Sequence, residues 1–169
     1  MRIVLSLLLL GPVSFFGEAA DFGPDKGALV IVGGAARDSV PYEKFVELAG
    51  GPKANIVVIP TAGGAKSYDS EWRGLETFRD HGVTNLTLLH TYSRKEADTA
   101  EFVAPLKKAT GVWFSGGRQW RLADSYLDTL VHQELWAVLN RGGVIGGSSA
   151  GATIQGSYLA RGDSKTNTI

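Results

Sequence analysis

The sequence contains no cysteine among its 169 residues. That absence excludes disulfide frameworks, thiolate metal sites and every mechanism that needs a cysteine nucleophile, so covalent catalysis would have to use another side chain. An excess of one charge is also missing, since 17 Lys and Arg balance 17 Asp and Glu. A neutral chain gives no reason to expect a nucleic-acid partner. Neither G-x-G-x-x-G nor G-x-x-x-x-G-K is present, and we expect no metal or organic cofactor.

Long hydrophobic runs are absent except at the N-terminus, where Arg2 precedes an apolar stretch over residues 3–16. Gly11, Pro12 and Glu18 interrupt this stretch before it reaches the roughly 20 apolar residues that span a bilayer. We therefore interpret residues 1–19 as a signal peptide cleaved after Ala19, in preference to a retained anchor or a buried strand. Residues 20–169 would then be a secreted or periplasmic domain, with no membrane attachment after the signal is removed.

Glycine is abundant, with 22 residues, and many of the glycines flank short apolar runs. Continuous apolar runs of this length are typical of strands buried on both faces of a parallel sheet. The predicted strands are 27–32, 55–59, 85–89, 111–114 and 143–145. Helices are predicted between them, at 42–48, 68–81, 95–108 and 118–140 with a break before Val131. This alternation predicts an α/β fold, a three-layer parallel sheet with helices on both faces.

The residues with the clearest chemical meaning follow the last predicted strand. Gly147-Ser148-Ser149-Ala150-Gly151 matches G-x-S-x-G, in which a sharp turn from strand to helix exposes a nucleophilic serine, here Ser149. The two glycines would leave room for the neighbouring chain. We expect a helix over residues 152–159, and the amide of Ala150 to donate to an oxyanion. Ordinary tight turns also contain Gly, Ser and Ala, so the flanking strand and helix are what favour the catalytic interpretation.

A second glycine pair, Gly116-Gly117, follows the preceding strand and continues into Arg118-Gln119. In a parallel sheet this turn can lie beside Ser149, where its free amides would complete an oxyanion hole. An ordinary turn with a solvated Arg118 is an equally good interpretation. Arg118 and Arg37 could select an acidic group of a substrate, because guanidinium pairs well with carboxylate. We expect the tryptophans at 113, 120 and 136 to pack in the core.

Two segments, 112–119 and 142–152, resemble the cyanophycinase and dipeptidase E group of serine peptidases. The resemblance implies a fold like that of the class I glutamine amidotransferases, a flavodoxin-like architecture, and hydrolysis of aspartyl peptides. It also implies that Ser149 is the nucleophile, that Gly117 and Ala150 supply the oxyanion amides, and that Gln119 contacts the substrate. Arg118 departs from the pattern, because cyanophycinases usually have an acidic residue there, and this argues against cyanophycin itself as the substrate.

A serine nucleophile needs a general base, and the chain has only three histidines. The resemblance places the family's histidine after the elbow, beyond Ile169, so we expect residues 20–169 to be the N-terminal part of a peptidase domain whose sheet is incomplete at its C-terminal end. Structural roles are expected for His81 and His132, whereas His90 is the in-chain candidate base. Asp163 is a candidate acid, although an aspartate after Arg-Gly is more often a turn former.

Three functions remain open on these residues. The first is an exported serine peptidase that cleaves aspartyl peptide bonds through an acyl-enzyme on Ser149. The second is a catalytically inactive domain that binds a peptide or an amino acid in the same crevice. The third is another serine hydrolase, such as an esterase. In each case exposed apolar edges could pair with another copy of the chain to form a homo-oligomer.

Overall fold

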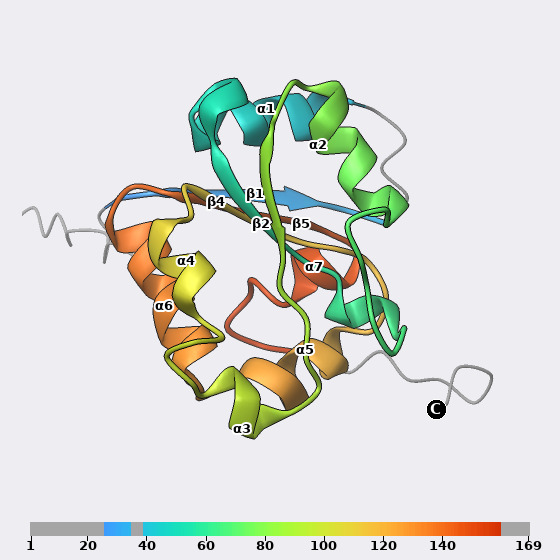
Figure 1. Cartoon of the computed structure of the whole chain (residues 1–169), viewed down its shortest axis with the longest axis vertical. Coiled ribbons are helices and arrows are strands. Elements are labelled where there is room, and N and C mark those ends of the chain that lie inside the picture. The colour runs from blue at the N-terminus through green and yellow to red at the C-terminus, as the bar shows by residue number, and fades with distance from the viewer. Residues whose placement is uncertain (1–25, 35–38, 160–169) are drawn as a thin grey trace, which may run out of the picture.

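Five parallel strands form one sheet in the order β1-β5-β4-β2-β3 (Figure 1). The computed structural model describes residues 26–34 and 39–159. The proposed signal peptide, Arg37 and Asp163 lie outside the described residues. The strands are β1 Ala28–Val32, β2 Asn55–Ile59, β3 Asn85–Leu88, β4 Gly111–Phe114 and β5 Val144–Ser148. All four neighbouring pairs are parallel, which confirms the predicted sheet.

Helices cover both faces of the sheet. Helices α1 and α2 lie on one face, and α4, α5, α6 and α7 lie on the other (Figure 1). The helices are α1 Val40–Ala49, α2 Glu76–Asp80, α3 Arg94–Ala97, α4 Ala104–Lys108, α5 Gln119–Tyr126, α6 Leu130–Asn140 and α7 Ala150–Thr153. Short 3-10 turns occur at η1 Gly51–Lys53, η2 Thr61–Gly63 and η3 Arg73–Leu75. The predicted three-layer α/β architecture is therefore confirmed.

The side chains of the central strands alternate between two hydrophobic cores. On β2, Val57 and Ile59 pack in the core beneath α4 to α7, whereas Ile56 and Val58 pack in the core beneath α1 and α2. Trp113 of β4 joins Ile56 and Val58 in that second core, and it is 3% exposed. Because both faces of these strands are buried, each had to be apolar at every position, which explains the unbroken apolar runs in the sequence.

The strand order determines where a ligand can approach. From β2 the chain proceeds to β3 at one edge of the sheet, whereas from β4 it proceeds to β5 in the opposite direction. The connections that follow these two adjacent strands therefore diverge on opposite faces and leave a crevice at their carboxyl ends. In open α/β sheets this is the usual place for a binding site, and the loops after β2, β4 and β5 all reach it.

Several predicted helices are shorter in the structure. The helix predicted over 68–81 is only α2, preceded by the 3-10 turn η3, and the helix predicted over 95–108 is two helices, α3 and α4. Pro105 explains the second break, because proline favours the first turn of a helix and here lies at the start of α4. The helix predicted over 152–159 is α7, which begins two residues earlier and extends for a single turn.

Two further expectations were wrong. Strand β5 does not end at residue 145 but continues through Gly146 to Ser148. Gly146 is required within the strand because the rings of Trp113 and Phe45 cross it there, and a β-carbon would lie within 2.7 Å of both. Trp136 is not a core residue. It is 50% exposed on α6, whereas Trp120 on α5 is half-buried.

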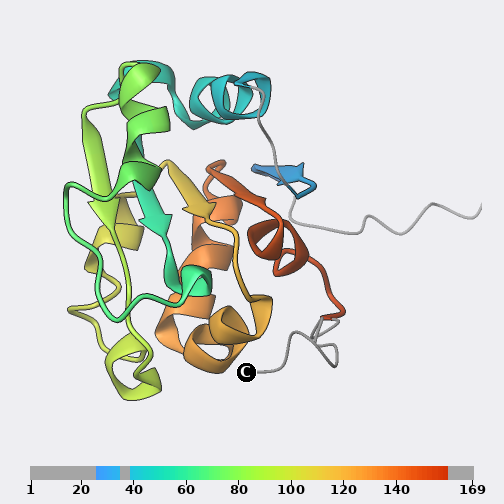
Figure 2. The same ribbon diagram turned by 90° about the vertical axis from the view of Figure 1, so that its right-hand side faces the viewer.

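Strand β1 leaves an apolar edge uncovered by the described residues. Ile31 is 63% exposed and Leu29 is 45% exposed, on the strand that Figure 2 shows at one side of the molecule. An exposed apolar edge strand favours pairing with another chain.

Across residues 26–34 and 39–159, no helix has the length and apolar composition that a membrane crossing requires.

Candidate active site

Ser149 lies at a sharp turn between β5 and α7. Its backbone has φ 53° and ψ −113°, a conformation that non-glycine residues rarely adopt. The turn is fixed at its start by the Ser149 amide, which donates to the carbonyl of Val32 on β1 at 3.0 Å. The side chain is exposed, and within the described part of the chain its hydroxyl makes no hydrogen bond. This strained, exposed serine is the arrangement that the G-x-S-x-G pattern predicts.

The two glycines of the pattern are required by their neighbours. A β-carbon on Gly147 would lie 2.6 Å from the carbonyl carbon of Gly151. A β-carbon on Gly151 would overlap the carbonyl of Phe114 on β4 and lie 2.8 Å from its β-carbon. Both neighbours are close to or part of the backbone and cannot move aside. The glycines therefore let α7 turn back tightly against β5 and β4, as the sequence predicted.

The Gly116-Gly117 turn lies beside this serine. A β-carbon on Gly116 would be 3.6 Å from the β-carbon of Ser149, which places the two turns in contact. Within the described residues, the amides of Gly117 and Ala150 make no hydrogen bond and are free to donate. Arg118 and Gln119 come next, half-buried at the start of α5. The structure thus brings together the serine, the two amides and the residues proposed to contact a substrate.

Gly117 packs against η2, the turn that follows β2. Its φ is +140°, and a β-carbon there would overlap the Ala62 carbonyl and lie 2.8 Å from the amide nitrogen of Gly63. The next amide, that of Arg118, donates to the same Ala62 carbonyl at 2.8 Å. Figures 1 and 2 show η2, which contains Ala62, beside α5. The position of the Gly117 amide therefore depends on Ala62.

A buried relay of hydroxyl groups supports the η2 turn. The Thr91 amide donates to the Tyr126 hydroxyl at 3.1 Å, and the Tyr126 hydroxyl lies 2.6 Å from Thr61 Oγ1. Thr61 Oγ1 in turn lies 2.9 Å from His90 Nδ1. The amide can only donate, so the Tyr126 hydroxyl accepts from Thr91, whereas each of the other two bonds can be donated from either side. His90 thus anchors η2 through its hydrogen bond with Thr61.

Removing the central hydroxyl of this relay should cost stability. Tyr126→Phe leaves the buried Thr61 and the Thr91 amide without their partner, and we expect the free energy of unfolding to fall by about 1–3 kcal/mol. Urea denaturation followed by circular dichroism measures the difference. Tyr42→Phe is the matched control, because the half-buried Tyr42 ring is held by Phe78 and Trp113. A loss no larger than that of the control would contradict the relay.

The relay also predicts how stability depends on pH. Burial lowers the pKa of His90 below its ordinary value of 6.5, against the opposing effects of the Lys66 and Ala65 carbonyls and the charge of Glu96. The unfolded chain therefore binds more protons than the native protein between the native pKa and about 6.5, so stability falls as the pH is lowered through that interval. His90→Asn should flatten this dependence in urea titrations over pH 5–7. Equal slopes in both proteins would refute the prediction, since His81 and His132 are common to both.

The hypothesis that His90 is the general base is not supported by its position. Strands β4 and β2 lie between β5 and β3, so the end of β3 is about 14 Å from the end of β5 at the usual spacing between strands. His81 donates to the carbonyl of Thr77 at 2.6 Å, and His132 contacts Asp128 and Trp136 near its own helix. In the described part of the chain, no histidine is hydrogen-bonded to Ser149. Structural roles for His81 and His132 agree with their predicted ones.

Sequence reasoning did not find the groups that support the site. Thr61 lies on η2, whereas Arg121 and Tyr126 lie on α5, and no local motif marks any of the three. The one available signal was the pair Gly63-Gly64, which has a structural reason: a β-carbon on Gly63 would lie 2.6 Å from the Tyr68 hydroxyl. Within the residues described, no group of three metal-ligating carboxylate or imidazole side chains occurs.

Comparison with known proteins gives one consistent result. The model of "Peptidase family S51" matches residues 29–168. A cyanophycinase from Synechococcus elongatus is 35% identical over 139 residues, which are 79% of this chain and 42% of that protein. A cyanophycinase from Nostoc sp. is 31% identical over 143 residues, 81% of this chain and 47% of that protein. The chain therefore spans less than half the length of these relatives.

A solved structure shares the fold. The crystal structure of a peptidase from an acI-B1 Actinobacterium superposes with a TM-score of 0.67 at 29% identity, covering 79% of this chain and 58% of that one. Together with the parallel five-stranded sheet, this confirms the expected fold, which is of the flavodoxin-like, class I glutamine amidotransferase-like type.

Proposed function

This chain belongs to peptidase family S51, and from that premise we propose that it functions as a serine peptidase whose nucleophile is Ser149. The observation that carries the proposal is the strained, exposed serine between β5 and α7, with the free amides of Ala150 and Gly117 beside it. Hydroxyl nucleophile and oxyanion donors are the two parts that acyl transfer requires in fixed mutual geometry.

The proposed reaction has two steps. Ser149 Oγ attacks the carbonyl carbon of the scissile peptide bond while a general base takes its proton, and the Gly117 and Ala150 amides donate to the oxyanion. The carbon–nitrogen bond then breaks, the leaving amine takes a proton, and an ester on Ser149 remains. Water attacks the ester, releases the carboxylic acid and returns the proton to Ser149.

We infer the substrate class from the relatives and from the residues after β4. Cyanophycinases are similar to this chain, and an aspartyl peptide is the proposed substrate, with Gln119 and Arg118 contacting it at the start of α5. The guanidinium of Arg118 has no carboxylate partner among the residues described, so it is available to an acidic group of the peptide. Its positive charge disfavours the arginine branches of cyanophycin.

Location and assembly are further parts of the proposal. Residues 1–19 support export as a secreted or periplasmic protein. The exposed Leu29 and Ile31 on β1 support a homo-oligomer that pairs this edge.

An inactive binding domain is the second candidate, and one observation favours it. No histidine of the described residues contacts Ser149, so the observed side chains alone do not activate the hydroxyl. Such a domain would hold a peptide in the same crevice without turnover.

Labelling separates the candidates. The full-length protein is treated with a fluorophosphonate probe, and the adduct is located by peptide mass spectrometry. A peptidase should be labelled on Ser149 and should hydrolyse a β-aspartyl dipeptide, whereas a binding domain would bind the dipeptide without an adduct or turnover. Hydrolysis of simple esters without peptide cleavage would identify an esterase.

A further inference from the structure

The position of the Gly117 amide depends on the Ala62 carbonyl, which Gly117 packs against. One side chain from outside η2 holds the direction of this carbonyl. Arg121 Nη1, on α5, donates to this carbonyl at 3.0 Å. The same oxygen accepts from the Arg118 amide at 2.8 Å. Ala62 is fully buried, and so is its neighbour Thr61. The guanidinium thus completes a junction between η2 and the turn after β4.

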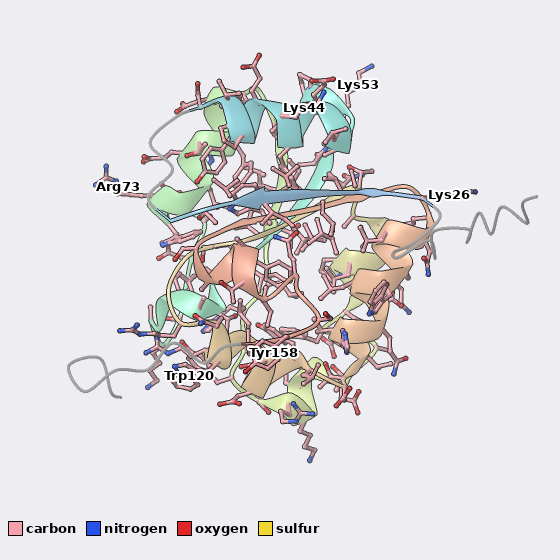
Figure 3. All side chains as sticks on the ribbon, turned by 180° about the vertical axis from the view of Figure 1, so that it is seen from behind. Lys26, Lys44, Lys53, Arg73, Trp120 and Tyr158 are labelled. Carbon is pink, nitrogen blue, oxygen red and sulfur yellow. The ribbon has the colours of Figure 1, made fainter. Side chains whose placement is uncertain are left out.

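Besides the Ala62 carbonyl, two neighbours hold Arg121 in place. The guanidinium lies over the ring of Trp120, with its Cζ 5.2 Å from the ring centre. Trp120 lies on the opposite side of the sheet from Lys44 and Lys53 (Figure 3). On the other side the guanidinium fills the space beside Gly64, where a β-carbon would lie 2.6 Å from Cζ. Gly64 has φ +89°, so this contact is the second reason for a glycine there.

The charge of Arg121 is not used in an ion pair. No carboxylate of residues 26–34 and 39–159 lies within ion-pair distance of it. Burying half of a guanidinium costs desolvation free energy. A smaller donor could make the same single hydrogen bond to a backbone carbonyl at a lower desolvation cost. The planar shape of the guanidinium, however, fixes the direction of that carbonyl more firmly than a flexible ammonium would.

We propose that Arg121 is a positioning residue for catalysis, because it orients the Ala62 carbonyl and, through it, holds the Gly117 amide toward the oxyanion formed at Ser149. This inference rests on the proposed function. Arg121 does not touch the substrate in this scheme, so its loss should act on the chemical step and leave substrate binding unchanged. The geometry required is sensitive, since small displacements of an oxyanion donor cost much of its effect.

Steady-state hydrolysis by the full-length protein tests the role. Arg121→Met keeps an unbranched side-chain stem and removes the guanidinium donor, and we expect kcat to fall about 10- to 100-fold with KM unchanged. Arg121→Lys should recover part of the loss, because an ammonium can still donate to the carbonyl. Gly64→Ala displaces the guanidinium without removing it and should lower kcat in the same way. The rate of fluorophosphonate labelling at Ser149 should fall in parallel.

Arg141→Met is the matched control. The Arg141 guanidinium also bonds backbone carbonyls, those of Leu106 and Ala109, but at the other end of the sheet. We expect this variant to unfold at a lower temperature and to keep its kcat. If Arg121→Met and Gly64→Ala label Ser149 as fast as the wild type, or if Arg141→Met loses as much kcat as they do, the positioning role is wrong. An unlabelled wild-type protein would instead refute the proposed function itself.

Discussion

Replacing Ser149 with alanine should abolish fluorophosphonate labelling and lower peptide hydrolysis by roughly 10⁵- to 10⁶-fold. The physical reason is that the Ser149 hydroxyl lies at the turn between β5 and α7 beside the free amides of Gly117 and Ala150 and would form the acyl-enzyme. The stability of the protein should not change, since the Ser149 hydroxyl makes no hydrogen bond within the residues described. Kinetics on a β-aspartyl dipeptide and urea denaturation measure the two quantities on the same samples.

Ser149→Gly separates the backbone of the turn from its chemistry. Glycine adopts φ 53° and ψ −113° without the steric cost that a β-carbon carries there, so this variant should be more stable than Ser149→Ala by about 1 kcal/mol while remaining inactive. Residual hydrolysis near the wild-type rate in either variant would exclude Ser149 as the nucleophile. A Ser149→Gly protein no more stable than Ser149→Ala would show that the turn is not strained.

The second large effect is expected at Gly151. Gly151→Ala introduces a β-carbon that overlaps the Phe114 carbonyl and lies 2.7 Å from its carbonyl carbon. Because the overlapping atoms belong to the Phe114 backbone, no change of a side-chain rotamer can relieve the overlap, and α7 must move away from β4. We expect the free energy of unfolding to fall by about 3 kcal/mol or more, and labelling of Ser149 to be lost with it.

Gly33→Ala is the control for this substitution. Gly33 follows β1 near the same edge of the sheet, yet a β-carbon there would have no heavy atom of the described residues within 4 Å. Its effect on stability should stay within about 1 kcal/mol, and labelling should be retained. If Gly151→Ala unfolded at the same urea concentration as this control, the close packing of α7 against β4 would be contradicted.

The separate tests probe different links between sequence and site. Substitution of Ser149 tests the chemistry, substitution of Gly151 tests the backbone that presents it, and substitution of Arg121 tests the support of the oxyanion turn. Because Ser149 and Gly151 lie within one turn, their effects on activity should not add, whereas the effects of Tyr126→Phe and Arg141→Met on stability should add within about 0.5 kcal/mol.

Much of this protein could be predicted from the sequence because the signals are local. The strand predicted over 55–59 becomes β2 with the same bounds, and its four buried residues, Ile56–Ile59, are all apolar because the strand is covered on both faces. G-x-S-x-G predicts a sharp turn at Ser149, and the structure has that turn, with backbone or strand atoms that permit only glycine at 147 and 151. Both signals lie within a few consecutive residues of the sequence, although the contacts that require them, such as Gly151 against Phe114, join residues distant in the chain.

The tertiary structure decided what depends on residues distant in sequence. The order β1-β5-β4-β2-β3 separates His90 from Ser149 and brings Ala62 against Gly117, and no periodicity in the sequence encodes that order. The helix lengths differ for the same reason, because capping and packing, such as Pro105 at the start of α4, override helical pattern. The sequence alone thus determined the strands and the glycine-flanked turn at Ser149, whereas the support of the Gly116-Gly117 turn by Thr61, Tyr126 and Arg121 arises only when η2 packs against α5.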